Sequence, residues 1–155
     1  MQMLSKKSKY ALRALMALSQ KKEDKPVLIA ELARQEKIPK KFLELILLEL
    51  KNKGILQSKK GKGGGYFLGR KPEEVSLGEV VRALDGPLAP LPCASQTAYR
   101  KCDECADEST CGIRAVMREV RDATAAILDQ ETIADMLRRI HDLRSKKSRV
   151  LVYAI

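Results

Sequence analysis

The glycine-rich stretch at residues 61–65 constrains the fold of this chain more than any other feature. Four glycines fall within five positions, with lysines before and among them: Gly61, Gly63, Gly64 and Gly65, and Lys59, Lys60 and Lys62. Apolar residues flank the stretch on both sides, at 55–56 and at 66–68. Two short apolar runs joined by a glycine-rich turn are typical of an antiparallel β-hairpin.

A glycine-rich loop beside lysines also suits a phosphate cradle in a nucleotide-binding enzyme. That cradle needs the pattern G-x-x-x-x-G-K followed by Ser or Thr, placed between a strand and a helix. Here neither Ser nor Thr follows the pair Gly61-Lys62, and the loop leads into the strand-like run 66–68. The sequence therefore favours a basic hairpin over a nucleotide site.

Two helices are predicted in the first 36 residues. Residues 8–20 have apolar side chains at helical spacing, and Ser8 is a candidate cap for the start. A charged turn at 21–26 separates them from a second helix at 28–36.

A third helix is predicted at residues 40–53, after Pro39 and before Gly54. Its expected buried or partly buried residues are Phe42, Leu43, Leu45, Ile46, Leu47 and Leu50. Helix, helix, turn, helix and hairpin, in that order, form a winged helix-turn-helix. We therefore expect a mainly α fold with a two-stranded β wing.

The remaining chain is predicted to hold helices around a cysteine-rich loop. Residues 76–84 form a helix capped by Ser76, with Glu79 at the capping-box position. A long helix follows at 112–130, and residues 130–144 continue or restart it. The predicted divisions are a winged helix-turn-helix domain at 1–86, a cysteine-rich loop at 87–111, a long helix at 112–144 and an unplaced tail at 145–155.

The positive charge lies in the first half of the chain. Residues 1–71 carry 18 Lys and Arg against 6 Asp and Glu, a net +12, whereas residues 72–155 carry 12 against 14, a net −2. This asymmetry indicates an anionic polymer or surface as partner of the first half, the alternative being a generally basic soluble protein. Aromatic residues make up only 4 % of the chain, so the core is expected to be aliphatic.

Several function classes are disfavoured by the sequence. No apolar run approaches the ~20 residues of a membrane span, and Arg13 interrupts the apolar stretch near the N-terminus. We therefore expect no membrane segment, no signal peptide and a cytoplasmic location. A single histidine and no nucleophile–base pairing argue against an enzyme. A protein-binding module remains the rival to a DNA-binding protein.

A winged helix-turn-helix predicts which side chains meet double-stranded DNA. The reading helix lies in the major groove, and the wing reaches phosphates or the minor groove. The candidate contacts come from the N-terminus, the third helix and the hairpin: Ser5, Lys6, Lys7 and Lys9; Lys40, Lys41 and Glu44; Lys59, Lys60, Lys62, Gly63 and Gly64. The plainer alternatives are that Lys40 and Lys41 are solvated and that Glu44 pairs with Lys40.

All four cysteines lie within nineteen residues, spaced C-x8-C-x2-C-x5-C: Cys93, Cys102, Cys105 and Cys111. In a cytoplasmic protein such clustering indicates a metal site or cluster rather than structural disulfides. Thiolates are ligands for Fe–S clusters and for zinc. Three readings stay open: an Fe–S cluster, a four-thiolate zinc site, or thiols acting alone.

The segments MLSKKSKYALRALMAL, KKFLELILLELKNKGILQSKKGKGGGYFLGR and SLGEVVRALDGPL, followed by cysteines, resemble the iron–sulfur-cluster regulator family of bacterial transcription factors (the IscR, NsrR and CymR type). The resemblance covers about residues 3–140, and GGGY is its most specific part. Family members usually have Arg-Gly-Pro before that motif, where this chain has Lys60-Gly61-Lys62. The resemblance implies a homodimeric transcription regulator whose long C-terminal helix is the dimer interface.

The resemblance also implies a ligand set. Cluster-binding members have three cysteines in this loop, and Cys93, Cys105 and Cys111 match them. The family's fourth ligand is a His or an acidic residue, but those positions hold Arg114 and Lys9 here. This leaves Cys102 as the expected fourth ligand of a 2Fe–2S or 4Fe–4S cluster, with zinc as the alternative.

Overall fold

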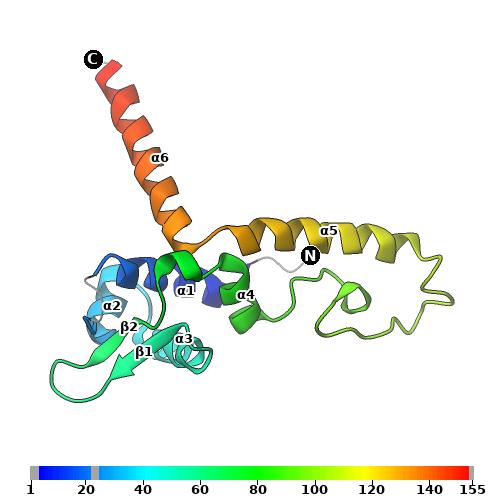
Figure 1. Ribbon diagram of the computed structural model, residues 1–155, viewed down its shortest axis with the longest axis horizontal. Coiled ribbons are helices and arrows are strands. Elements are labelled where there is room, and N and C mark those ends of the chain that lie inside the picture. The colour runs from blue at the N-terminus through cyan, green and yellow to red at the C-terminus, as the bar shows by residue number, and fades with distance from the viewer. Residues whose placement is uncertain (1–3, 22–24, 154–155) are drawn as a thin grey trace.

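The computed structural model describes residues 4–21 and 25–153, with side chains described as far as Arg149. The elements are α1 (Lys6–Ser19), α2 (Ile29–Glu36), α3 (Lys40–Asn52), β1 (Leu56–Lys59), β2 (Gly65–Leu68), η1 (Pro72–Glu74), α4 (Leu77–Asp85), η2 (Pro92–Ala94), α5 (Gly112–Gln130) and α6 (Ile133–Tyr153). Helices α1–α4 and the hairpin form one body, from which α5 and α6 extend in different directions (Figure 1).

The hairpin is the predicted wing. Strands β1 and β2 pair antiparallel, with Leu56 opposite Leu68 and Lys59 opposite Gly65. Val27, between α1 and α2, adds a further bridge to the outer side of β2, since its N–H and carbonyl both pair with Tyr66 at 2.9 Å. The mainly α, winged helix-turn-helix prediction is confirmed.

The core of the body is aliphatic, as the scarcity of aromatic residues predicted. Its largest fully buried apolar side chains come from the three first helices, the hairpin, α4 and α6: Leu15, Leu32, Leu43, Ile46, Leu47, Leu50, Ile55, Leu56, Val75, Val80 and Ile133. Burying a side chain of this kind contributes about 1.5–3 kcal/mol. Ile133 shows that the start of α6 belongs to the same core as α1.

The N-terminal cap differs from the prediction. Helix α1 begins at Lys6 and is capped by Ser5, whose Oγ accepts a hydrogen bond from the Ser8 N–H at 3.0 Å. Ser8 was predicted as the cap, but its side chain is fully buried on the inner face of the helix. The predicted cap of α4 is confirmed, because Ser76 Oγ accepts from the Glu79 N–H at 3.1 Å. The charged turn predicted at 21–26 lies partly outside the described residues.

Helix α3 has more leucines than its inner face can hold. Leu43, Ile46, Leu47 and Leu50 are fully buried and Phe42 is partly buried, as predicted. Leu45 was expected among them, but it is 59 % exposed, and Leu48 is 48 % exposed. A repeat of 3.6 residues per turn places positions 45 and 48 on the side away from the core.

Of the two possibilities left open for residues 130–144, a restart of the helix is the one that the structure has. Helix α5 ends at Gln130, and Thr132 and Asp135 start α6 by capping each other's N–H groups at 3.2 and 2.9 Å. Helix α6 then continues to Tyr153, so residues 145–153 are helical rather than an unplaced tail. No helix in the described parts of the chain is both long and apolar enough to cross a bilayer.

The joint between α5 and α6 is fixed to the body. The Leu77 N–H donates to Glu131 O at 2.8 Å, and the Ile133 N–H donates to Val75 O at 3.0 Å. Beside this joint, the guanidinium of Arg82 on α4 donates two hydrogen bonds to the Asp129 carboxylate, at 2.6 and 2.8 Å. The direction in which α5 leaves the body is therefore set by contacts with α4.

Candidate nucleic-acid interface and cysteine loop

The start of α3 presents the predicted charges to solvent. Lys40 and Lys41 are exposed, and Glu44 is partly exposed. Lys40 Nζ lies 3.9 Å from Glu44 Oε1, so the predicted i, i+4 pair is present. Exposed ion pairs of this kind contribute only about 0.3–0.5 kcal/mol to stability. Lys40 and Glu44 can therefore leave this pair and bind another partner.

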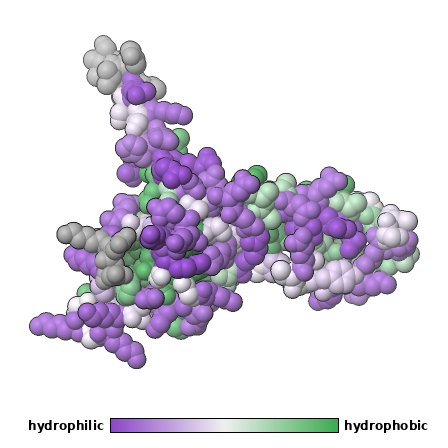
Figure 2. Space-filling view, viewed as in Figure 1, coloured by the Kyte–Doolittle hydropathy of each residue, from purple (hydrophilic) through white to green (hydrophobic). Residues whose placement is uncertain are grey.

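The tip of the hairpin is a basic turn with little side-chain bulk. Lys59, Lys60 and Lys62 are exposed, and Gly61 and Gly63 have positive φ angles of 90° and 75°. This geometry brings three ammonium groups and an exposed backbone to one end of the molecule. Hydrophilic side chains cover this tip at the lower left of Figure 2.

Gly64 has a different role from its neighbours. It is buried, and its N–H donates to Gly61 O at 3.0 Å. A Cβ at this position would lie 2.3 Å from Lys59 O. The structure thus uses the Gly64 N–H inside the turn, where sequence reasoning expected it to face a phosphate.

The predicted contacts on α1 divide into two kinds. Lys6 and Lys9 are exposed. Ser5 donates its hydroxyl to the Asp85 carboxylate and its N–H to Asp85 Oδ2 at 3.2 Å. Lys7 Nζ lies 2.7 Å from Glu49 Oε2 on α3. Ser5 and Lys7 therefore hold the start of α1 against α4 and α3, the helix predicted to read DNA.

The cysteine loop runs beside α5 and, apart from η2, is irregular (Figure 1). Cys93 in η2 is buried, Cys102 is exposed, and Cys105 and Cys111 are half-buried. Cys111 caps α5, since its Sγ accepts from the Arg114 N–H at 3.5 Å. All four thiols are free of disulfides.

Cys105 and Cys111 are neighbours in space as well as in sequence. Loss of solvation raises the pKa of the Cys105 thiol, and a hydrogen bond with Cys111 and the nearby Cys111, Cys102 and Glu108 charges raise it further. The structure thus brings Cys105 and Cys111, two of the predicted ligands, within hydrogen-bonding distance of each other.

The four thiols fit a metal or cluster by chemistry but not by position. Among the described residues, no three His, Cys, Asp or Glu side chains lie close enough to hold one ion. Cys93 is buried in η2, Cys111 caps the first turn of α5, and Cys102 and Cys105 lie between them in the irregular part of the loop. The predicted four-thiolate site is thus not assembled in this conformation of the loop.

Two arginines of α5, missed by sequence reasoning, hold the loop in place. Arg114 Nε donates to Cys93 O at 3.0 Å, and Arg121 donates from Nη1 to Ala94 O. Arg121 is the buried residue of α5, although the charge of a guanidinium disfavours burial. The available signal was their spacing of seven residues, which places both on one face of a helix.

The outer face of α5 carries an apolar stripe that no described residue of the chain covers. Ile113, Val116 and Ile127 are exposed and lie at helical spacing on this face. Green apolar patches are visible along the α5 arm in Figure 2. An apolar stripe of this kind marks a protein interaction surface.

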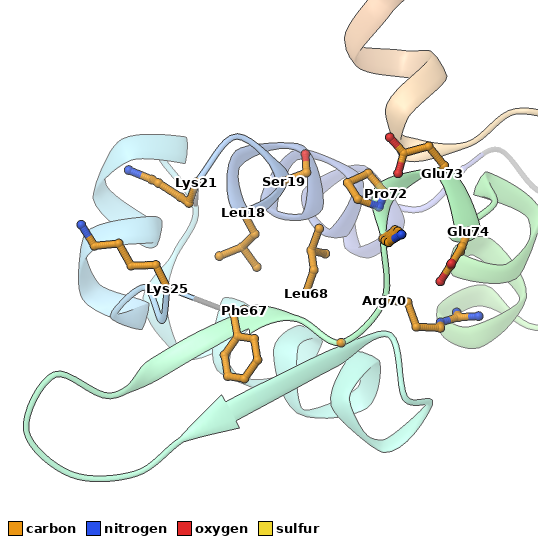
Figure 3. A pocket seen from close by; sticks show the side chains of 12 residues that line it. Leu18, Ser19, Lys21, Lys25, Phe67, Leu68, Arg70, Pro72, Glu73 and Glu74 are labelled. Atoms are coloured by element: carbon orange, nitrogen blue, oxygen red, sulfur yellow. The ribbon is translucent and has the colours of Figure 1, made fainter. Parts of the chain in front are cut away.

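A groove of about 860 Å³ lies between the end of α1, β2 and the segment 69–74 (Figure 3). Leu18 and Leu68 lie between Lys21 and Lys25 at one end and Glu73 and Glu74 at the other. None of the residues predicted to bind DNA or metal lines it. The groove is therefore separate from both candidate sites.

Comparison with known proteins identifies the family. Residues 4–139 match Rrf2, described as "Iron-dependent Transcriptional regulator". The chain is 46 % identical over 138 residues to an Rrf2-like HTH-type transcriptional regulator of Rhodobacter capsulatus, covering 87 % of this chain and 92 % of that one. It is 26 % identical over 134 residues to the HTH-type transcriptional regulator IscR of Cronobacter sakazakii, covering 86 % and 79 %.

Among solved structures, CymR, the global cysteine regulator of B. subtilis, superposes with a TM-score of 0.71 at 27 % identity, covering 88 % of this chain and 96 % of that one. The relatives are transcription regulators and not enzymes, which agrees with the predicted lack of catalytic groups. The family resemblance seen in the sequence is confirmed: the chain belongs to the Rrf2 family of transcriptional regulators.

Proposed function

We propose that two copies of this chain form a regulator that binds a double-stranded DNA operator and changes its affinity with the state of the cysteine loop. The observation that carries the proposal is the edge formed by α3 and the hairpin, where basic side chains and a low-bulk turn lie together on a winged helix-turn-helix. As a DNA-binding regulator, the protein would act in the cytoplasm.

The proposed DNA contacts follow the exposure of the side chains. Lys40, Lys41 and Glu44 face base edges or nearby phosphates at the start of α3. Lys59, Lys60, Lys62 and Gly63 meet the backbone from the wing, and Lys6 and Lys9 meet it from α1. Ser5, Lys7 and Gly64 support this surface through their contacts with Asp85, Glu49 and Gly61.

The apolar stripe of α5 is the proposed dimer interface. Exposed Ile113, Val116 and Ile127 lie on one face of α5, opposite the face that contacts η2 and α4. Pairing this stripe with its copy removes apolar surface from water, which favours association. It also fixes the separation of the two reading helices, which must match the spacing of two half-sites.

The link from the cysteines to DNA runs through α5. Cys111 caps the helix, and Arg114 and Arg121 hold η2, so a change at the thiols alters how α5 leaves the body. A coupling of about 1–3 kcal/mol would change operator affinity roughly 5- to 150-fold.

The candidate ligand of the loop is an Fe–S cluster, which would supply redox chemistry, with Cys93, Cys102, Cys105 and Cys111 as its thiolates. Because the described loop does not gather three of these ligands, assembly of a cluster requires the loop to rearrange. The alternative is a zinc-stabilised or metal-free regulator that works through thiol oxidation or a protein partner. The proximity of Cys105 and Cys111 supports the thiol version.

Two measurements test the proposal. Binding to DNA fragments is measured across salt concentrations, and affinity that falls steeply with salt is expected for a surface that neutralises several phosphates. Iron, sulfide and zinc are then measured in protein purified without oxygen, with absorbance at 300–500 nm. A colourless protein with one zinc per chain would show that the loop holds zinc and not an Fe–S cluster. Full DNA binding by metal-free protein would leave only regulation through thiol oxidation or a protein partner.

A further inference from the structure

The outward face of α3 carries two leucines beside a lysine. At about 100° per residue, Leu45 lies about 40° and Leu48 about 20° from Lys41 around the helix axis, so the three share one stripe. The two leucines are 59 % and 48 % exposed, whereas the inner face of the helix is fully buried. Leu45 and Leu48 therefore do not form part of the hydrophobic core.

The surroundings of the stripe indicate what covers it. On α3 the stripe is bordered by exposed Lys40 and Lys51 and by half-buried Glu44 and Glu49. Glu44 pairs with Lys40 and Glu49 pairs with Lys7. Helix α3 and the hairpin lie along the same lower edge of the molecule in Figure 1, with α5 and α6 above it. With both carboxylates paired to lysines, this basic edge is complementary to a polyanion, which favours DNA over an apolar protein surface.

The major groove offers one kind of apolar group, the C5-methyl of thymine, and apolar side chains recognise it by contact. We propose that Leu45 and Leu48 read thymine methyl groups in the operator, so that the face of α3 selects sequence by apolar contact as well as by charge. This inference rests on the proposed DNA-binding function and names the base that its reading helix prefers.

The spacing of the two leucines sets the expected pattern. Three helical residues rise about 4.5 Å, and successive bases of one strand are about 3.4 Å apart. Leu45 and Leu48 therefore reach methyl groups on the same or neighbouring base pairs. Each half-site is expected to contain thymine at one or two adjacent positions that face α3.

Uracil tests this directly, because it differs from thymine only by the missing methyl. A preferred duplex is first selected by the full-length protein from a pool of random 30-base-pair duplexes. That duplex is then made with dU replacing dT at single positions. For the wild-type protein, one or two positions per half-site are expected to lose about fourfold in affinity each, as for one buried methyl-sized group.

Variants assign the effect to the leucines. Leu45→Ala and Leu48→Ala are expected to weaken binding to the dT duplex and to remove the difference between dT and dU. Leu143→Ala, an equally exposed leucine on α6, is the matched control and is expected to keep that difference. Lys41→Ala is expected to weaken binding to both duplexes equally and to reduce the salt dependence.

The outcomes separate this inference from the function on which it rests. Equal affinity of the wild type for dT and dU duplexes overturns it, as does a dU effect that persists in Leu45→Ala and Leu48→Ala together. A change of mass on Leu45→Ala, measured by sedimentation, also overturns it, because the stripe is then a protein interface. Failure to select any duplex removes the proposed function itself.

Discussion

The guanidinium Nε of Arg114 donates a 3.0 Å hydrogen bond to the carbonyl oxygen of Cys93. This bond attaches the first cysteine of the loop to α5, the helix that Cys111 caps. Arg121 repeats the contact two turns later at Ala94. Cys93 is buried by this arrangement while Cys102 is exposed. The loop thus has one buried thiol, two half-buried thiols and one exposed thiol.

This arrangement predicts unequal thiol reactivity. Cys102 is expected to react first with a maleimide and Cys93 last, because only accessible thiolates are attacked. Arg114→Ala is expected to bring labelling of Cys93 close to the rate of Cys105, since η2 loses a tether. Peptide mass spectrometry at timed intervals measures each site. Arg118→Ala, at an exposed position of α5, serves as the control and should leave the order unchanged.

A charge in the apolar stripe of α5 is expected to separate the proposed dimer. Val116→Asp places a carboxylate beside Ile113 in the proposed interface between two copies of α5. Burying an unpaired charge in that interface is costly. Sedimentation should then give the monomer mass, with affinity for a two-half-site duplex reduced at least tenfold. Arg118→Asp adds the same carboxylate outside the stripe, and a wild-type mass is expected. An unchanged mass for Val116→Asp would place the dimer contact elsewhere.

The cap of α1 gives a stability prediction with a neighbouring control. Ser5→Ala removes the hydroxyl that caps α1 and donates to Asp85, and about 1 kcal/mol of stability is expected to be lost. For a chain of this size that is roughly 2–4 °C in Tm. Ser8→Ala should be neutral or slightly stabilising, because the buried Ser8 Oγ has no partner among the described residues. Thermal unfolding at fixed protein concentration measures both.

The Arg82–Asp129 pair predicts a dependence of stability on acid. Hydrogen bonds from Arg82 hold the pKa of the Asp129 carboxyl below its ordinary value of 3.8. A carboxyl group whose pKa is lower in the folded than in the unfolded protein stabilises the fold at pH values above its pKa in the unfolded protein. That stabilisation is lost as the pH falls through its pKa in the folded protein. The stability difference between wild type and Asp129→Ala should therefore be constant above about pH 5 and shrink below pH 4.

Urea unfolding from pH 3 to 7 measures this difference. Because the pair is partly exposed, salt screening keeps the effect small. Asp142→Ala, on the exposed part of α6, should show no such change with pH. A constant difference down to pH 3 would contradict the assignment.

Replacing Gly63 or Gly65 of the hairpin by alanine is expected to lower the stability of the fold by different amounts. Gly65 has φ of 143°, and a Cβ there would lie 2.2 Å from Val27 O, so Gly65→Ala breaks the bridge between Val27 and Tyr66. Gly63 also has a positive φ, but no atom lies within 4 Å of its would-be Cβ. Gly63→Ala should cost about 1–2 kcal/mol and Gly65→Ala clearly more. Equal losses in urea unfolding would count against this geometry.

The sequence predicted the parts of the fold that depend on local signals. Glycine spacing identified the hairpin, and apolar periodicity located the helices before it. It misplaced Leu45 because α3 is leucine-rich on two faces, and periodicity alone does not say which face is inside. The break between α5 and α6 was ambiguous because Thr132 and Asp135 form their cap inside an otherwise helical pattern.

In the candidate sites, too, the sequence predicted the features that depend on local signals and missed those that depend on contacts between distant residues. Exposed lysines on α3 and the wing followed from charge and order along the chain. The use of Ser5 and Lys7 within the fold depends on Asp85 and Glu49, which are distant in sequence, so no local pattern reveals it. The attachment of η2, which carries Cys93, to α5 likewise depends on contacts of Arg114 and Arg121 that no local pattern reveals.

The burial of Ile133 in the core of the DNA-binding body has a consequence for biosynthesis. Translation proceeds at roughly 5–20 residues per second, so the reading helix and wing leave the ribosome seconds before the residue that closes their core. The nascent chain exposes its cysteines before that closure. Chemical modification of these thiols can therefore take place before the core of the helix-and-hairpin body is complete.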